Sequence, residues 1–208
     1  MSKSLINAVR KDCQDHGVKV YFPKRSQVAV NIKPFQWYKN CDGWFCQIDK
    51  ELVVWESPQM LPVLAHEYGH FLQWKEGFKY MKARKNGVPY TQKFNYWVDG
   101  LDLGEKELTQ ILNGIIQIEW NCEIRALDIM EEYNIVTNKR KYLTSALSAI
   151  YGYYYVKEYR TNVNTPAFAF LQAQADELIQ AGKLPSKFPY NQALYKKFAR
   201  ETKKYLKQ

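Results

Sequence analysis

Two histidines and a glutamate occur within one five-residue stretch, His66-Glu67-Tyr68-Gly69-His70. Histidines four positions apart on a helix lie about one turn from each other on the same side, so both imidazoles can reach one tetrahedral Zn²⁺. Glu67, on the same turn, can then face a water molecule as general base rather than bind the ion. Because zinc lowers the pKa of such a water to about 7, the spacing predicts a hydrolytic metal site.

The residues around this motif favour the helix that it needs. Apolar side chains recur at spacings of three and four between Leu61 and Gln73, Pro62 suits a first turn, and Gly77 suits a stop. Gly69 is locally unfavourable, by about 1 kcal/mol relative to alanine, which indicates that another backbone passes close to it. The plainer alternative is a surface helix with two coincidental histidines, although two of the chain's three histidines fall in the motif.

Two histidines and a water leave one coordination position for another side chain. His16 is the remaining histidine, and we expect its predicted helix to lie far from the motif helix. Glu119 and Glu123 occupy adjacent turns of a later predicted helix. One could bind the ion while the other accepts a hydrogen bond from a ligand histidine, or both could face solvent on an acidic helix.

The first motif is followed 49 positions later by Glu119-x-x-Cys122-Glu123-x-x-Ala126. This pair of motifs resembles the gluzincin metallopeptidases, particularly the ImmA/IrrE-like and minigluzincin families, over residues 52–130. The resemblance implies that Glu119 is the third zinc ligand and Glu123 a supporting acid, with a register shift of four making Glu123 the ligand instead. It also implies a short sheet whose edge strand holds an extended peptide beside two helices that clasp the zinc. Cys122 departs from the alanine usual in these families, and Glu123 from the usual Asp or Asn.

Many gluzincins stabilise the oxyanion of the reaction with a distal His or Tyr, and no histidine follows His70. Tyr151 and Tyr154 belong to a run of tyrosines and are candidates for this role through a phenolic hydrogen bond. Packing in a core or groove is the plainer role for both.

The first third of the chain predicts a small mixed sheet. Short runs rich in β-branched and aromatic residues predict three to four strands packed on a zincin-like motif helix, at 18–22, 27–32, 43–48 and 52–55. Asp42-Gly43 is a candidate hairpin tip. Region 77–104 has no clean period and is expected to be a groove-lining loop, a lid or an insertion without function.

Long helical patterns predict a mostly helical C-terminal half, at 105–133, 138–159 and about 191–206. The fold class is therefore α+β. We expect a zincin-like metallopeptidase core at 1–135 and a helical extension at 136–208 that packs on it as one compact unit.

The 208 residues carry a net charge of +9. Basic residues gather from Lys75 to Lys93 and from Lys183 to Gln208, where they suit solvated faces or contacts with nucleic-acid phosphates. No uncharged run reaches the roughly 20 apolar residues of a membrane span, and the N-terminus lacks the apolar core of a signal peptide.

The four cysteines, Cys13, Cys41, Cys46 and Cys122, lack paired spacing and do not imply a disulfide framework. For Cys41 and Cys46 we expect packing as thiols rather than a structural metal. A cytoplasmic protein with reduced thiols follows as the expectation.

These features predict a zinc-dependent peptidase with one Zn²⁺ per chain. Its ligands would be His66, His70 and Glu119, its general base Glu67, and its substrate a peptide or protein. The alternative is a zincin-like module that binds protein or nucleic acid without cutting. The intact Glu67 favours catalysis.

Overall fold

The computed structural model describes residues 2–24, 41–82, 84–85, 87–135, 137–161 and 166–207. The fold is α+β, with a small mixed sheet and mostly helical content. The chain forms two compact units, unit 1 from Met1–Phe78 and Cys122–Thr137 and unit 2 from Lys79–Asn121 and Asn138–Gln208. The division runs through helix α4 (Glu105–Glu132), so these units do not coincide with the predicted ranges 1–135 and 136–208.

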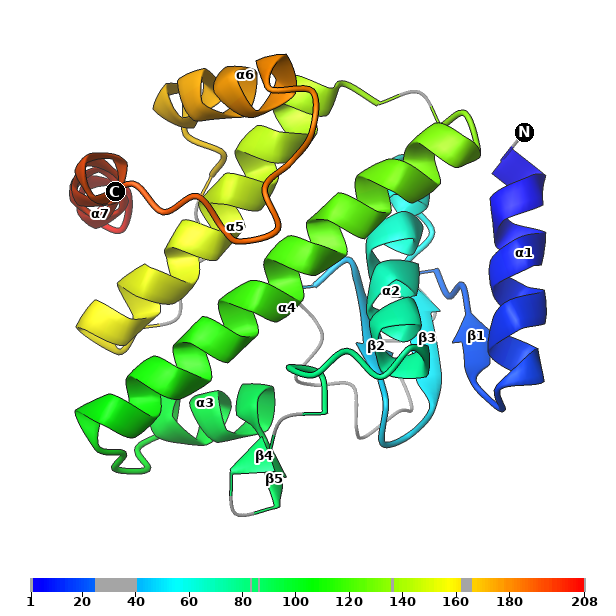
Figure 1. Ribbon diagram of the computed structural model, residues 1–208, viewed down its shortest axis with the longest axis horizontal. Helices are drawn as coiled ribbons and strands as arrows, with labels where there is room; N and C mark the ends of the chain where they lie inside the picture. Colours follow the sequence, from blue (N-terminus) through cyan, green and yellow to red (C-terminus); the bar gives the residue numbers. More distant parts are fainter. Residues whose placement is uncertain are drawn as a thin grey trace. The chain divides into compact units, whose positions relative to one another are not determined.

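Unit 1 contains a three-stranded sheet with the order β1-β3-β2, shown in Figure 1. Strand β1 (Lys19–Tyr21) runs parallel to the central strand β3 (Glu51–Val54), whereas β2 (Gly43–Cys46) runs antiparallel to it. The predicted N-terminal mixed sheet is confirmed with three strands. The fourth candidate, 27–32, lies outside the described residues.

The predicted hairpin tip at Asp42-Gly43 is wrong. The turn between β2 and β3 is formed by residues 47–50, and Lys50 adopts a positive φ of 52° there. Gly43 instead begins β2, where a Cβ atom would lie 2.8 Å from Val63 Cγ1 and 3.0 Å from Glu67 Cγ. The glycine is therefore needed for a close approach between β2 and the motif helix.

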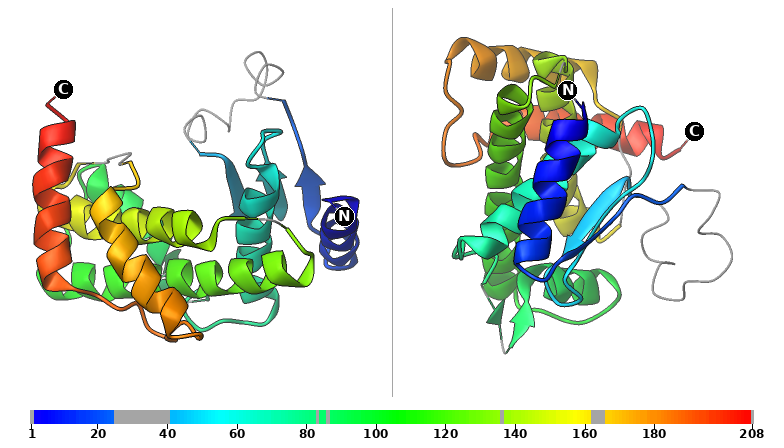
Figure 2. Two further views of the ribbon diagram at one scale, coloured as in Figure 1. Left: turned by 90° about the horizontal axis from the view of Figure 1, so that it is seen from above. Right: turned by 90° about the vertical axis from the view of Figure 1, so that its right-hand side faces the viewer.

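The motif residues lie on α2 (Met60–Lys75), which confirms the predicted helix. This helix packs on β2 and β3, and α1 (Ser2–Asp15) packs on β1 and α2 (Figures 1 and 2). Burial explains the arrangement, because the apolar side of α2, with Leu64, Ala65 and Phe71, is removed from water against the buried β3.

Asp12 joins α1 to α2 through charged hydrogen bonds. Its carboxylate accepts from the Tyr68 hydroxyl at 2.7 Å and from Lys75 Nζ at 2.6 and 2.8 Å. The pKa of Asp12 is lowered, since these hydrogen bonds outweigh the partial burial that would raise it. The ionised form of Asp12 therefore stabilises the contact between the two helices.

Gly69 of α2 lies against the part of α4 that belongs to unit 1. A Cβ atom at this position would lie 2.9 Å from Cys122 Sγ and 3.3 Å from the Cys122 carbonyl oxygen. The prediction that another backbone passes close to Gly69 is confirmed. A bidentate pair between Arg125 and Glu76, at 3.0 and 2.7 Å, joins the same two helices.

Unit 2 is built around α5 (Lys139–Tyr159), against which α6 (Gln172–Gln180) and α7 (Gln192–Tyr205) pack. A short 3₁₀ helix, η3 (Ala169–Leu171), precedes α6. The predicted helices at 105–133, 138–159 and 191–206 are confirmed. Region 77–104 is more regular than expected, since it contains the hairpin of β4 (Arg84–Lys85) and β5 (Val88–Pro89) and the helix α3 (Tyr90–Val98).

None of the helices in the described part of the chain is both long and apolar enough to cross a membrane. Cys41 and Cys46 pack against a buried cluster of Trp44, Val53 and Trp55, which confirms the predicted packing role of these thiols.

Candidate metal centre

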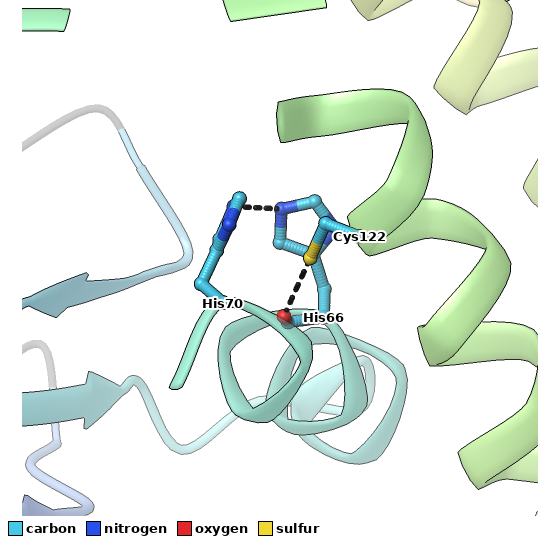
Figure 3. Close-up of side chains that lie close together, drawn as sticks. All are labelled: His66, His70 and Cys122. Atoms are coloured by element: carbon cyan, nitrogen blue, oxygen red, sulfur yellow. Dashed lines mark hydrogen bonds between the residues drawn. The ribbon is translucent and has the colours of Figure 1, made fainter. Parts of the chain in front are cut away.

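The two motif histidines face each other on one side of α2, as Figure 3 shows. Their Nε2 atoms are 3.1 Å apart, and the rings are nearly perpendicular, with centroids 4.7 Å apart. Nitrogens bound to one tetrahedral zinc at about 2.0–2.1 Å would be about 3.3 Å apart. The observed separation thus suits two nitrogens that bind the same ion.

The other nitrogen of each ring faces a hydrogen-bond acceptor. Nδ1 of His66 lies 3.3 Å from Glu123 Oε1, and Nδ1 of His70 lies 3.0 Å from Oε1 of the fully buried Gln73. An ionised carboxylate and an amide oxygen only accept hydrogen bonds, so they favour the tautomers with the proton on Nδ1. Both Nε2 lone pairs then point toward the same small region.

Two unprotonated Nε2 atoms at 3.1 Å would repel each other. A proton on one of the two nitrogens, or a metal ion bound by both, removes this repulsion. The pKa of His66 is raised well above its usual range: burial of the ring opposes protonation, but the electrostatic and hydrogen-bond interactions of the ring with Cys122 and Glu123 outweigh it. The site therefore attracts positive charge.

Cys122 is the third member of this group. Its Sγ atom and one nitrogen from each of His66 and His70 all lie within 4.8 Å of one another. The thiol is buried and donates a hydrogen bond to the His66 carbonyl oxygen at 2.9 Å. One imidazole pair and one thiol form a donor set that suits a soft or borderline metal ion.

Glu67 lies on the same turn as His66, and its side chain is buried beside the start of β2. Its negative charge also reaches Cys41. Burial raises the pKa of the Cys41 thiol to about 11, and the Glu67 carboxylate adds to the shift. Glu67 is therefore placed between α2 and the edge strand.

Glu119 is not a member of the three-residue group. It lies one turn before Glu123 on α4 and belongs to unit 2, whereas the histidines belong to unit 1. Its role as third ligand stays a prediction. Glu123 does approach His66, in the position expected of a supporting acid.

The two candidate tyrosines lie on α5 in unit 2. Tyr151 is fully buried; its hydroxyl donates to Gln174 at 3.2 Å and accepts from the Asn191 backbone at 3.1 Å. Tyr154 packs against Tyr190, with ring centroids 4.6 Å apart, and burial raises its pKa to about 12. These contacts give both tyrosines a packing role, and oxyanion stabilisation by either stays a prediction.

His16 lies closer to the motif helix than expected. Its ring contacts the edge of Phe71 on α2, at a centroid distance of 5.7 Å, because α1 packs against α2. Its Nδ1 lies 2.8 Å from the Asp12 carbonyl oxygen. The expectation that it would lie far from the motif was wrong, but His16 is not part of the candidate metal centre.

Sequence reasoning missed two residues of the site. Gln73 occurs three positions after His70 on the same helix, a spacing that brings two side chains together. For Cys122, the only signal in the sequence was the difference from the alanine that is usual at this position in the gluzincin families. Comparison of the chain with protein-family models, curated proteins and solved structures gave no match.

Proposed function

We propose that the protein is a zinc-dependent peptidase. The observation that carries this proposal is the pair of Nε2 atoms 3.1 Å apart, each on a ring whose Nδ1 faces an acceptor. This arrangement fixes both rings in the orientation that metal binding requires. His66 and His70 would hold the ion, together with a third ligand from α4, for which the gluzincin resemblance implies Glu119.

A bound zinc ion would lower the pKa of a water molecule to about 7 and would polarise the carbonyl group of the peptide. Glu67 is proposed to accept a proton from the attacking water and to deliver it to the leaving amine. Its position beside His66 and its low exposure of 7% support that role, because a carboxylate shielded from solvent is held in a defined place.

The proposed substrate is a peptide in extended form. Strand β2 has β3 on one side, and its other edge has no strand partner among the described residues. An extended chain could add to that edge by main-chain hydrogen bonds. Gly43 on β2 lies next to Glu67, so a peptide bound there would pass the proposed base. Packing of α2 on this sheet, with Cys122 of α4 against Gly69, supports a zincin-like fold.

The proposed binding-module alternative has less support from the basic residues between Lys75 and Lys93. Lys75 pairs with Asp12, and the buried Lys93 pairs with Glu107 at 2.5 Å. On α7, Lys203 lies over the ring of Tyr159, with Nζ 4.1 Å from the centroid. Several of the basic side chains thus already have partners within the chain.

The test is the substitution Glu67→Gln in the full chain. Zinc content should stay near one ion per chain, whereas hydrolysis of an unbiased peptide library should fall by roughly 10²–10⁴-fold, the typical contribution of a general base. Glu56→Gln, at an exposed position before α2, is the matched control and should keep full activity. Hydrolysis that persists in Glu67→Gln, or a wild-type chain that binds no zinc, would overturn the proposal.

A further inference from the structure

We propose that Cys122 binds the metal ion as a thiolate beside His66 and His70. This inference rests on the proposed function for the existence of the ion, but it assigns a ligand that the gluzincin resemblance does not supply. The ion would then be held by two nitrogens and one sulfur, from α2 and α4.

The geometry of unit 1 supports this assignment. The sulfur lies beside the His66 ring in Figure 3, within 4.8 Å of a nitrogen of each histidine. In a tetrahedral site with Zn–S of about 2.3 Å and Zn–N of about 2.0–2.1 Å, sulfur and nitrogen would be about 3.6 Å apart. Since 4.8 Å is the upper limit of the present separations, metal binding requires the sulfur and the nitrogens to move together by at most about 1.2 Å.

Gly69 provides the space that the sulfur occupies. A single Cβ atom there would come within 2.9 Å of Sγ, so α2 carries no side chain at the point where Cys122 approaches the histidines. The other three cysteines are not in the group: Cys13 is buried on α1, and Cys41 and Cys46 pack against tryptophans. The sulfur of Cys122 is thus distinguished by its position.

Binding exchanges one hydrogen bond for one metal bond. The S–H bond of Cys122 breaks, its proton leaves to solvent, and a sulfur–metal bond forms. The hydrogen bond from the thiol to the His66 carbonyl is lost in the exchange. No electron transfer is involved, and the metal ion is the only added reactant.

A thiolate ligand would affect which metal ion binds and how many coordination positions remain for water. A thiolate favours Zn²⁺, Cd²⁺ and Co²⁺ over Mg²⁺ and Mn²⁺. Three protein ligands leave one position for water, as a hydrolase requires. If Glu119 binds as well, four protein ligands fill the coordination shell, and the ion meets no water until one ligand leaves.

The experiment uses Co²⁺ as the probe, added to the full chain. A thiolate ligand gives a sulfur-to-cobalt charge-transfer band in the near ultraviolet, which histidine and carboxylate ligands do not give. The wild-type chain should show this band. Cys122→Ala should lose it and bind Co²⁺ at least about 10–100-fold more weakly, the loss typical of removing even a supporting group around a metal.

Two controls keep the result specific. Cys13→Ala removes another fully buried thiol of unit 1 and should retain the band. A chain with Cys13, Cys41 and Cys46 all replaced by alanine leaves the site untouched, and a retained band assigns the signal to Cys122 even if Cys122→Ala does not fold.

The outcomes separate the two proposals. Co²⁺ binding that depends on His66 and His70 but shows no charge-transfer band would overturn the Cys122 assignment and leave the proposed peptidase standing. A wild-type chain that binds neither Co²⁺ nor Zn²⁺ would overturn both.

Discussion

The two motif histidines have different groups behind them. His66 faces the carboxylate of Glu123, whereas His70 faces the neutral amide of Gln73. A carboxylate acceptor makes the imidazole a stronger base and metal ligand than an amide does. We therefore expect metal affinity to depend more strongly on Glu123, behind His66, than on Gln73, behind His70.

Glu123→Gln tests this dependence, because the glutamine keeps an acceptor but removes the charge. Zinc affinity should fall by about 10–100-fold, while the ion still binds when zinc is in excess. Competition with a chromophoric chelator measures the affinity. Glu132→Gln, an exposed position on the same helix, is the control and should leave it unchanged. Complete loss of zinc from Glu123→Gln would instead identify Glu123 as a direct ligand.

Glu119→Ala addresses the third ligand directly. If Glu119 binds zinc, as the gluzincin resemblance implies, its replacement should abolish metal binding at stoichiometric zinc, measured by elemental analysis after gel filtration. Retained zinc in Glu119→Ala would contradict that role. Comparison with Cys122→Ala under the same conditions then identifies which side chain of α4 the ion requires.

At the level of elements, the site depends on how closely α2 and α4 approach within unit 1. Gly69 allows Cys122 to lie against α2, and the pair between Arg125 and Glu76 joins the helices one to two turns away. Cys122 and Glu123 both reach the histidines from this segment of α4. A change in the distance between these helices should therefore alter the contacts of Cys122 and Glu123 with His66 together.

Gly69→Ala should lower both stability and zinc affinity. Its Cβ meets Cys122 at 2.9 Å, and overpacking of this kind costs about 1–3 kcal/mol. The gain in helix propensity, about 1 kcal/mol, cancels the low end of that range and leaves a net loss over the rest of it. Gly152→Ala in α5 is the matched control, because a Cβ there meets nothing within 4 Å. Thermal unfolding should shift downward for Gly69→Ala and upward for Gly152→Ala; an upward shift in both would show that α2 and α4 are not in close contact.

At the level of the whole molecule, the long helices and the presence of a sheet could be predicted because each has a periodic pattern of its own. The helix α3 was missed, since its nine residues contain too few repeats to show a period. Asp42-Gly43 was mistaken for a turn because the sequence does not distinguish a glycine that allows close packing from one that allows a turn.

From residue spacing alone, the site was predictable only where its residues share one helix, whereas Glu123 on α4 was expected through the gluzincin resemblance. His66 and His70 follow from spacing alone, and Gln73 could have been found from the same helix. Which side chains of α4 face α2 depends on contacts between residues far apart in the sequence, such as Cys122 and His66, which are 56 positions apart. The same limit explains the error over His16, whose contact with Phe71 depends on how α1 packs.

Unit 1 also contains a partly exposed charge pair, Asp12 with Lys75, that makes its stability sensitive to acid. The folded-state pKa of Asp12 is lowered, so its carboxylate holds its proton less tightly in the folded chain than in the unfolded chain. Its contribution to stability is fully present above the unfolded pKa of about 3.9 and is lost as pH falls through the lower folded value. Hydrogen bonds to charged groups contribute about 1.5–3 kcal/mol, and the exposure of Lys75 lowers the expected value toward the roughly 1 kcal/mol of surface ion pairs.

The expected result is a stability that decreases below about pH 4 in the wild type and decreases less in Asp12→Asn, which cannot ionise at this position. Asp12→Asn should also be less stable near pH 7, because Lys75 and Tyr68 lose a charged acceptor. Urea unfolding of the chelator-treated chain at several pH values measures both effects without a contribution from metal binding. Asp15→Asn, whose carboxylate pairs with the exposed Lys11 on the surface of α1, should leave the pH dependence close to that of the wild type. Identical acid sensitivity in the wild type and Asp12→Asn would show that the carboxylate between α1 and α2 does not stabilise the fold, and that other acidic groups govern the acid transition.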